Sequence, residues 1–408
     1  LPIITILEKD GKINEEGGEF AGKSREEARK LIIERFEELG LLEKIEDIQH
    51  NVSLSDRSKS PVEPLVSEQW FVRMSELAGP AIKAVETGRL KFHPERWSKT
   101  YLGWLENVQD WCISRQLWWG HRIPVWYDED GVPCASRDDL EIGSLHPETG
   151  KPIVSQDPDV LDTWASSWLW PFATLGWPDQ TEDLARFYPT HFLSTAQEII
   201  YLWVARMVMA GYAFLDHLPE DERCPFEVCN IHATLLDAKG KRMSKSAGNG
   251  IDPIEMIDEY GADAVRLSLI LLTKEGQDTR LSPDKIDQAW RFGNKVWNAA
   301  RFVLMSMDGE RTDGTSASAE RLEDRWILSR LSKTITAVTD DLDAYRFNDA
   351  AMAVYRFVWN DFCDWYLELV KARMSDEGPS GAAARGTLAR VLRDILGLLH
   401  PFTPYMTE

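Results

Sequence analysis

Residues 240–249 read Gly-Lys-Arg-Met-Ser-Lys-Ser-Ala-Gly-Asn, and three cations and two hydroxyls fall within six consecutive positions of this stretch. We call it the cationic loop. A helix start follows: Asp252 is the expected N-cap, Pro253 the first helical residue, and Glu255 the second half of a capping box. A cationic loop ahead of a helix suits a polyphosphate, because fixed positive charge stabilises negative charge that grows during reaction. The alternative is a solvated Lys-Arg turn without a chemical role.

The composition narrows the class of protein. The chain has 408 residues, enough for two or three domains with substantial cores, and a formal charge of −21. Any RNA contact would therefore come from local basic patches, because the chain as a whole is acidic. Five cysteines are present, without a Cys-x-x-Cys pair: Cys112, Cys134, Cys224, Cys229 and Cys363. We expect a cytoplasmic protein without a disulfide framework or structural zinc, and the sequence contains no apolar run of membrane-spanning length.

The cationic loop carries a family resemblance. Residues 242–246, Arg-Met-Ser-Lys-Ser, resemble the Lys-Met-Ser-Lys-Ser signature of class I aminoacyl-tRNA synthetases, with arginine in place of the first lysine. Four more stretches make nearly the whole chain similar to the valine-specific enzymes: 159–164 (Asp-Val-Leu-Asp-Thr-Trp), 203–207 (Trp-Val-Ala-Arg-Met), 294–302 (Asn-Lys-Val-Trp-Asn-Ala-Ala-Arg-Phe) and 362–369 (Phe-Cys-Asp-Trp-Tyr-Leu-Glu-Leu). The first two are loosely shared with the isoleucine-specific enzymes. The resemblance implies an α/β fold, with part of a doubly wound, Rossmann-like catalytic domain followed by an all-α anticodon-binding bundle.

The resemblance and the pattern of elements divide the chain into four parts. We expect the tail of an inserted editing domain and its return linker in residues 1–66, and the second half of the Rossmann-like domain with a connective insertion in 67–225. Residues 226–320 would form the stem-contact region with the cationic loop and a linker. A truncated helical anticodon-binding domain would occupy 321–408. On this reading the chain is a C-terminal-half fragment.

Local patterns predict several individual elements. Residues 3–7 are apolar and typical of a short strand, and Ser24 with Glu27 forms a capping box for a helix that stops near Gly40. Residues 308–320 are rich in Gly, Ser, Thr and Asp, which is typical of a linker. In the last part, helical spacing predicts one buried face of a bundle, made of Val358, Phe362, Trp365 and Leu369.

A strand end near residue 195 is the best place for chemistry. Residues 191–194 are typical of a strand end, and Thr195 with Glu198 forms a Thr-x-x-Glu capping box on an apolar helix, 199–209. Ligands of doubly wound sheets bind where strands end and helices begin. Glu198 is therefore either a helix cap or, by resemblance, the acidic residue that binds the ribose of ATP. The resembling enzymes carry Asp after a Gly there, whereas this chain has Glu198 and Ala196, whose methyl group narrows a close backbone approach.

Three apolar residues are candidates for an amino-acid pocket. Ile199 and Trp203 are spaced i, i+4 on the predicted helix, which by itself is typical of core packing. Trp164 follows a predicted strand. The resemblance implies that Trp164, Ile199 and Trp203 line the pocket for the valine side chain. Such a pocket excludes isoleucine by size but rejects threonine only about a hundredfold, because an apolar wall discriminates weakly against an added hydroxyl.

The resemblance also implies a two-step reaction. The valine carboxylate attacks the α-phosphate of Mg²⁺-ATP in line, and pyrophosphate leaves. A ribose hydroxyl of the terminal adenosine of tRNA(Val) then takes the valyl group from the adenylate. Positioning and charge stabilisation carry most of the rate, because no side-chain nucleophile is needed. We expect valine, ATP and tRNA(Val) as partners, no membrane, and a monomer.

The cationic loop supplies most of the expected ATP-binding residues. Lys245 would bind the departing β- and γ-phosphates, assisted by Lys241 or Arg242. Arginine in place of lysine keeps the charge but changes the donor geometry. His232, at the end of a predicted strand 226–231, either lies beside the adenine or serves structure. The expected ATP-site residues are Lys241, Arg242, Met243, Ser244, Lys245, Ser246, Ala196, Glu198 and His232.

Several motifs of the resembling enzymes are absent from the sequence. It contains neither a His-x-Gly-His stretch nor the acidic motif used in editing, and residues 55–58 read Ser-Asp-Arg-Ser where many relatives carry Cys-x-x-Cys. We therefore expect no zinc at that position and no valine activation by these 408 residues alone. The alternatives are an isoleucine–tRNA ligase and a non-catalytic, synthetase-like tRNA-binding paralogue.

Residues 111–116, Trp-Cys-Ile-Ser-Arg-Gln, resemble the point at which the chain returns from the editing insertion. Arg115 either contacts RNA or pairs with a carboxylate such as Asp110. An isolated arginine among aromatic residues favours the ion pair.

Overall fold

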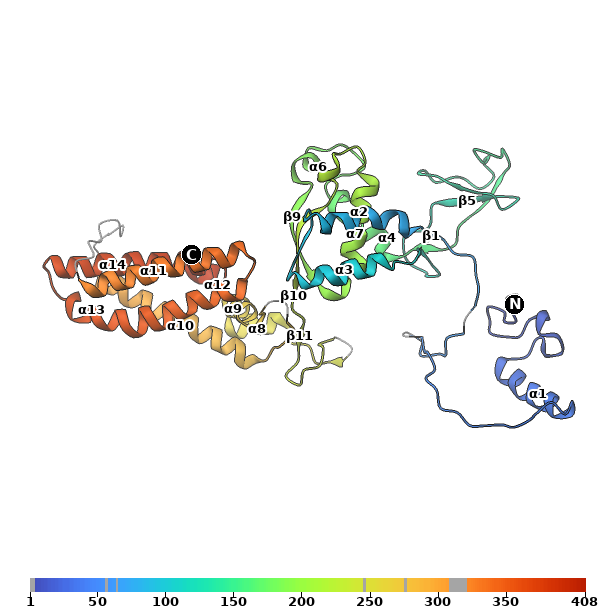
Figure 1. The fold of residues 1–408 in the computed structure, drawn as a ribbon, viewed down its shortest axis with the longest axis horizontal. Helices are drawn as coiled ribbons and strands as arrows, with labels where there is room; N and C mark the ends of the chain where they lie inside the picture. Colours follow the sequence, from blue (N-terminus) through green and yellow to red (C-terminus); the bar gives the residue numbers. More distant parts are fainter. Residues whose placement is uncertain (1–3, 56–57, 64, 245–246, 275–276, 308–320) are drawn as a thin grey trace. The chain divides into compact units, whose positions relative to one another are not determined.

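The computed structural model describes residues 4–55, 58–63, 65–244, 247–274, 277–307 and 321–408. The chain forms two compact units, one from residues 1–72 with 112–114 and the other from residues 73–111 with 115–408. Figure 1 traces the elements of each unit along the sequence. The predicted linker, 308–320, lies outside the described residues.

The first unit contains a 3₁₀ helix, Glu15–Phe20, and one α-helix, α1 (Arg25–Glu38). The predicted capping box is confirmed: the Glu27 N–H donates to the Ser24 hydroxyl at 3.2 Å, and the Ser24 N–H donates to the Glu27 carboxylate at 3.0 Å. The predicted strand 3–7 is wrong for its described residues, which form only an isolated bridge between Leu7 and Ile13. The chain turns back at Gly11, and among the described residues the pairing that follows is limited to the Glu8 N–H with the Lys12 carbonyl and the Asn14 N–H with the Ile6 carbonyl.

A parallel three-stranded sheet lies at the centre of the α/β layer in the second unit. Its order is β2 (Lys91–His93), β10 (Phe226–His232), β9 (Thr190–Ala196). Cys229 and Ile231 of β10 are buried, as expected for a parallel strand covered on its faces. Helix α3 (Arg96–Glu106) packs against β2 and against α2 (Met74–Glu86), and α2 packs against α7 (Ala205–Phe214) (Figure 1).

The chain between β9 and α7 is helical but irregular. A 3₁₀ turn, η2 (Gln197–Ile199), and a π-helix, η3 (Ile200–Val204), precede α7. The predicted Thr195–Glu198 capping box is therefore wrong. Thr195 is buried inside β9 opposite Ile231, and no side chain caps the helix start at Ala196. Pairing with β10 keeps the backbone extended through Ala196, two residues beyond the predicted strand end.

A small antiparallel sheet follows the return segment of the second unit. Its order is β6 (Pro133–Ala135), β5 (Val125–Asp128), β7 (Ile153–Gln156), and Trp126, Cys134 and Ile153 form its core. The remaining short elements before β9 are β1 (Phe71–Val72), β3 (Trp111–Cys112), β4 (Ser114–Arg115), β8 (Val160–Leu161), α4 (Thr163–Ser167), α5 (Trp170–Ala173) and α6 (Glu182–Phe187).

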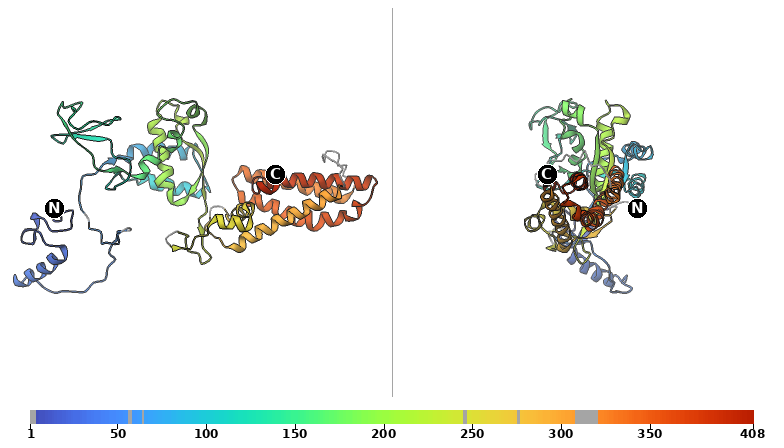
Figure 2. Two further views of the ribbon diagram at one scale, coloured as in Figure 1. Left: turned by 180° about the vertical axis from the view of Figure 1, so that it is seen from behind. Right: turned by 90° about the vertical axis from the view of Figure 1, so that its left-hand side faces the viewer.

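The C-terminal part is helical, with one continuous core cluster running from α9 to the last turn of the chain. A short parallel pair joins β11 (Leu235–Leu236), which precedes these helices, to β12 (Thr279–Arg280), which lies between α9 and α10. The helices are α8 (Pro253–Tyr260), α9 (Ala262–Leu272), α10 (Pro283–Ser306), α11 (Leu322–Asp343), α12 (Phe347–Arg356), the π-helix η6 (Phe357–Tyr366), α13 (Leu367–Met374), α14 (Pro379–Leu399) and α15 (Pro404–Thr407) (Figures 1 and 2).

The predicted buried face of the bundle is half wrong. Val358 and Phe362 are buried, whereas Trp365 is 62% exposed and Leu369 is 50% exposed. The reason is the π-helix η6, whose hydrogen bonds run from residue i to i+5 and change the residues that recur on one face. Tyr366 and Val370 are buried in place of the two exposed residues.

The predicted fold class is confirmed: an α/β layer with a parallel sheet precedes a helical bundle. Among the helices formed by the described residues, none has both the length and the apolar composition needed to cross a lipid bilayer.

Candidate functional site

Two parallel strands end side by side at the candidate site. β9 ends at Ala196 and β10 ends at His232, and these two residues are partners in the strand register. Glu198 follows in the 3₁₀ turn η2. Ligands of doubly wound sheets bind at the carboxyl ends of the strands. Three predicted ATP-site residues therefore meet at one edge of the sheet.

The cationic loop leaves β11 as a hairpin. Leu236 forms an antiparallel bridge with Arg242, and Gly240 at the turn has a φ of 82°, a left-handed conformation that favours glycine. The Asp237 carboxylate accepts hydrogen bonds from the Lys239 N–H at 2.9 Å and the Lys241 N–H at 2.8 Å. Asp237 has no role among the predicted site residues, although aspartate ahead of a glycine is typical of such turns.

The described cationic side chains of the loop, Lys241 and Arg242, face solvent. Lys241, Arg242 and Ser244 are exposed, whereas Met243 is half-buried and packs against the bundle core. The described residues of the loop thus have a single apolar anchor beneath an exposed polar surface. The other two predicted phosphate-binding residues, Lys245 and Ser246, lie outside the described residues.

The predicted start of the following helix is confirmed at Asp252 and Pro253, but the hydrogen bonds of the described residues include no capping box with Glu255. Asp252 is the N-cap of α8, its carboxylate accepts from the Ile254 N–H at 2.8 Å, and Pro253 is the first helical residue. Pro253 has the backbone angle that a first helical residue needs and donates no N–H there. The cationic loop is therefore bounded by β11 on one side and by a capped helix on the other.

An ion pair joins the cationic loop to the sheet edge. The Arg242 guanidinium lies 2.9 Å from Oε1 of Glu198. Oε2 of Glu198 is buried and has no hydrogen-bond partner among the described residues. A buried polar atom without a partner requires an explanation, because leaving it unpaired costs roughly 1–3 kcal/mol. The Glu198 carboxylate therefore has one buried acceptor, Oε2, that the described residues do not use.

The three candidate pocket residues lie on elements that contact one another. Trp164 belongs to α4, which packs against the π-helix η3 that contains Trp203. The Trp203 indole N–H donates to the Ser167 carbonyl at 3.1 Å, which ties the two elements together. Trp164, Ile199 and Trp203 are all half-buried. The predicted i, i+4 pairing of Ile199 and Trp203 assumed a regular α-helix. Regular α-helical geometry begins only at Ala205, after both residues.

Arg115 pairs with a carboxylate, as predicted, but with a different one. Its guanidinium lies 3.0 Å from Oδ2 of Asp162, and the same oxygen accepts from the Trp111 indole N–H at 2.9 Å. The proposed partner Asp110 instead accepts from the Met74 N–H at the start of α2. Asp162 is buried directly before α4, so this pair fixes the segment that carries Trp164.

Arg206 completes a buried cluster around the same indole. Its guanidinium carbon lies 4.1 Å from the Trp111 ring centroid and 5.7 Å from that of Trp104, within the range of cation–π attraction. Burial lowers the pKa of Arg206, and the nearby Asp162 carboxylate opposes that shift. The return segment, α7 and the start of α4 are therefore linked through one tryptophan.

Replacing Asp162 by alanine should lower the free energy of unfolding by about 1–3 kcal/mol, because the buried indole N–H of Trp111 loses its acceptor. Urea unfolding followed by far-UV circular dichroism measures the change. Asp179→Ala, at an exposed loop position, is the matched control and should change stability by less than about 0.5 kcal/mol. Equal free energies of unfolding for the two variants would show that the contacts of Asp162 with Trp111 and Arg115 do not stabilise the fold.

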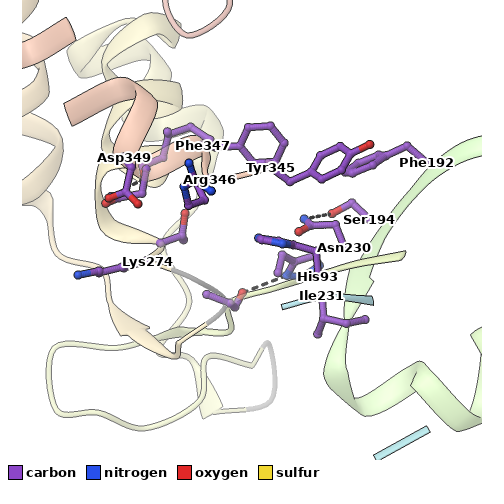
Figure 3. Close-up of a pocket in the computed structure, with 15 residues that line it drawn as sticks. His93, Phe192, Ser194, Asn230, Ile231, Lys274, Tyr345, Arg346, Phe347 and Asp349 are labelled. Carbon is purple, nitrogen blue, oxygen red and sulfur yellow. Dashed lines mark hydrogen bonds between the residues drawn. The ribbon is translucent and has the colours of Figure 1, made fainter. Parts of the chain in front are cut away.

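A cavity of about 250 Å³ adjoins the same strand ends (Figure 3). Ser194, Asn230 and His232 line it on the sheet side, and Tyr345, whose ring stacks on Phe192 at 5.2 Å, lies across from them. The Asn230 amide donates to the Ser194 hydroxyl at 3.3 Å. The cavity's polar groups are paired within the protein to a large extent: Arg346 binds Asp341, and Asn348 donates to the Ile270 and Leu271 carbonyls. His232 is exposed, and its Nδ1 lies 3.0 Å from the Ala233 carbonyl oxygen.

Two family models match the chain. Residues 29–282 match the tRNA synthetases of class I (I, L, M and V), and residues 324–408 match the anticodon-binding domain of tRNA ligase. Two solved structures share the fold at 21% identity. A Mycobacterium tuberculosis methionyl-tRNA synthetase bound by methionyl-adenylate has a TM-score of 0.62 over 86% of this chain and 64% of that one. An Agrobacterium radiobacter LeuRS in a ternary complex with tRNA and LeuAMS has a TM-score of 0.61 over 74% and 40%.

The curated relatives are more similar in sequence. Valine–tRNA ligases of Carboxydothermus hydrogenoformans and Thermotoga maritima are each 49% identical, over 409 and 411 residues, across 100% of this chain and 46% of the relative. A Dehalococcoides mccartyi valine–tRNA ligase is 46% identical over 408 residues. The chain thus spans about half the length of the curated relatives it matches. Because the class I tRNA synthetase model matches residues 29–282, more than half of the chain, and the anticodon-binding model matches residues 324–408, this chain belongs to the class I tRNA synthetase family.

Proposed function

We propose that this chain is part of a valine–tRNA ligase. That enzyme activates valine with ATP to valyl-adenylate and transfers the valyl group to the terminal adenosine of tRNA(Val). The observation that carries the proposal is the Arg242–Glu198 contact, which holds the cationic loop against the carboxyl ends of β9 and β10. That edge is where a nucleotide binds in a doubly wound sheet. The valine specificity rests on the curated relatives, all of which match across the full chain.

In the first step, an oxygen of the valine carboxylate attacks the α-phosphorus of ATP, and the bond to the bridging oxygen of pyrophosphate breaks. We assign Lys241, Arg242 and Ser244, together with Lys245 and Ser246, to the charge that accumulates on the leaving pyrophosphate. Mg²⁺ enters with ATP as part of the substrate. Lys241, Arg242 and Ser244 lie on one short hairpin, which would deliver several donors to the phosphates at once.

The remaining ATP contacts are assigned to the sheet edge. Glu198 accepts hydrogen bonds from the ribose hydroxyls, Ala196 lies beside the nucleotide and its methyl group limits how closely the backbone approaches, and His232 and Met243 flank the base. The Arg242–Glu198 pair indicates how binding begins, because the ribose and the guanidinium would compete for one carboxylate. The guanidinium, once released, is then available to the phosphates.

Valine selection is assigned to Trp164, Ile199 and Trp203. Two large aromatic side chains and one branched aliphatic residue leave a small apolar volume, which fits an isopropyl group and excludes a longer side chain. Threonine is nearly isosteric with valine, so such a pocket discriminates against it only about a hundredfold. In the second step, residues 321–408 would bind the anticodon arm of the tRNA, whose terminal ribose hydroxyl takes the valyl group from the adenylate and releases AMP.

Valine-dependent ATP–pyrophosphate exchange tests the proposal. Two proteins are compared: this chain alone, and a chimaera in which it replaces the aligned segment of the Carboxydothermus hydrogenoformans relative. We expect no exchange from the chain alone, and exchange from the chimaera with valine far above isoleucine and about a hundredfold above threonine. A preference for isoleucine would establish the isoleucine–tRNA ligase instead. A folded chimaera that binds tRNA without exchange would establish the non-catalytic alternative.

A further inference from the structure

One side chain connects both ends of the cationic loop. The carboxamide of Asn249 makes three hydrogen bonds within the loop. Its Oδ1 accepts from the Ser244 N–H at 3.0 Å, and its Nδ2 donates to the Arg242 carbonyl at 3.1 Å and to Oδ2 of Asp237 at 2.8 Å. Asn249 thus binds the backbone on the incoming side of the loop while itself lying on the outgoing side.

Asp237 extends this arrangement to the hairpin turn. Oδ1 of Asp237 accepts from the Lys239 and Lys241 N–H groups, while Oδ2 accepts from Asn249. The Asn249 carboxamide and these backbone N–H groups hold the pKa of Asp237 below its usual range. Two side chains, 12 positions apart, therefore organise the hairpin from residue 237 to residue 249.

The backbone of the cationic loop is held by these hydrogen bonds and only slightly by packing. Lys241, Arg242, Ser244 and residues 247–248 are exposed, and Asn249 is half-buried among them. Packing therefore contributes little to the shape of the loop beyond the Met243 anchor. Hydrogen bonds that are partly shielded from water must fix its backbone instead.

From these contacts we infer that Asn249 and Asp237 are positioning residues for the nucleotide: they hold the backbone of Arg242 and Ser244 in the geometry from which the loop engages the ATP phosphates. This inference rests on the proposed function. It adds two residues that themselves touch no substrate. Their effect is to keep the loop's donors preorganised, so that less order has to be gained when ATP binds.

The chemistry of the pair makes it testable by exchange of the two residues. Asn249→Asp alone places two carboxylates opposite each other, and Asp237→Asn alone places two amide donors opposite each other. The double variant Asp237→Asn/Asn249→Asp restores a donor facing an acceptor and keeps acceptors for the Ser244, Lys239 and Lys241 N–H groups. It loses the bond to the Arg242 carbonyl and places a carboxylate oxygen against that carbonyl oxygen, so it restores the contact between the two side chains but not this contact with the backbone. A double-mutant cycle measures the contact between the two side chains.

Hydrogen–deuterium exchange on the full 408-residue chain tests the contacts without any need for activity. We expect Asn249→Ala and both single polar variants to accelerate exchange of the Ser244 amide about tenfold or more, and the double variant to recover most of the protection. Exchange in β9 and β10 should not change. Asn298→Ala is the matched control, because that exposed asparagine bonds only to a carbonyl of its own helix. Unchanged exchange of Ser244 in Asn249→Ala would overturn the inference.

Kinetics of the chimaera test the link to the nucleotide. Asn249→Ala should lower kcat for pyrophosphate exchange about tenfold and leave the KM for valine unchanged, and the double variant should recover most of the rate. A merely structural role would lower the melting temperature with no change in kcat for the folded enzyme, and that result would overturn the inference. A parent chimaera without exchange would refute the proposed function and this link with it, while the deuterium-exchange result would stand separately.

Discussion

Replacing Glu198 by alanine should lower kcat/KM for ATP in pyrophosphate exchange by about a hundredfold. Hydrogen bonds to a charged group contribute about 1.5–3 kcal/mol, and each 1.4 kcal/mol corresponds to a tenfold change. Oε2 of Glu198 is buried without a partner among the described residues. Its desolvation cost is therefore already included in the folded protein, and a ribose hydroxyl that binds it does not add that cost. Exchange rates of the chimaera at varied ATP concentration measure the effect.

Three further variants separate the role of Glu198 from a general disturbance of the sheet. Glu198→Asp, which introduces the residue usual in the resembling enzymes, should retain activity within about tenfold. Glu227→Ala changes an exposed carboxylate on β10 and should have no effect. Arg242→Ala should lower kcat more than it raises the KM for ATP, because the guanidinium leaves Glu198 when the nucleotide binds. If kcat/KM for ATP of the Glu198→Ala chimaera lay within twofold of the parent value, the ribose would not bind at this edge of the sheet.

Replacing Arg373 by methionine should lower the free energy of unfolding by about 3–5 kcal/mol. The Arg373 guanidinium makes a two-pronged contact with Asp324, at 3.0 and 2.8 Å, and a further contact with Glu323 at 2.9 Å. Asp324 is fully buried, so removal of its partner leaves an uncompensated charge in the core of the bundle. Urea unfolding monitored by circular dichroism measures the loss.

A surface pair provides the control for this prediction. Lys371→Met, two residues before Arg373, removes the exposed partner of Glu368, and it should cost less than about 1 kcal/mol because water screens exposed ion pairs. Equal losses for Arg373→Met and Lys371→Met would mean that the buried pair does not hold the bundle together.

Two capping patterns show how far the sequence could predict local structure. Ser24-x-x-Glu27 forms its box, and no hydrogen bond among the described residues takes either side chain away from it. Thr195-x-x-Glu198 has the same pattern and does not form one, because β10 holds Thr195 in the sheet and Arg242 takes the carboxylate of Glu198. A local signal is thus reliable only where no distant partner binds the same residues.

In the candidate site too, features encoded by neighbouring residues could be predicted, whereas contacts between distant residues could not. The cationic loop, the strand ends and the capped start of α8 could be predicted, because each is encoded within a few consecutive residues. The Arg115–Asp162 pair and the Asp237–Asn249 pair could not, because their members lie 47 and 12 positions apart in the sequence and meet only in the fold. The prediction of the buried bundle face was wrong for a different reason. No residue pattern indicated the π-helix, which places Trp365 on the exposed side.

A crystal structure of the chimaera with a non-hydrolysable valyl-adenylate analogue tests the central claim most directly. We predict that the ribose hydroxyls lie within hydrogen-bonding distance of the Glu198 carboxylate, that Arg242 has moved from Glu198 towards the phosphate, and that the valyl side chain contacts Trp164 and Trp203. An intact Arg242–Glu198 pair with the adenylate bound elsewhere would contradict the account.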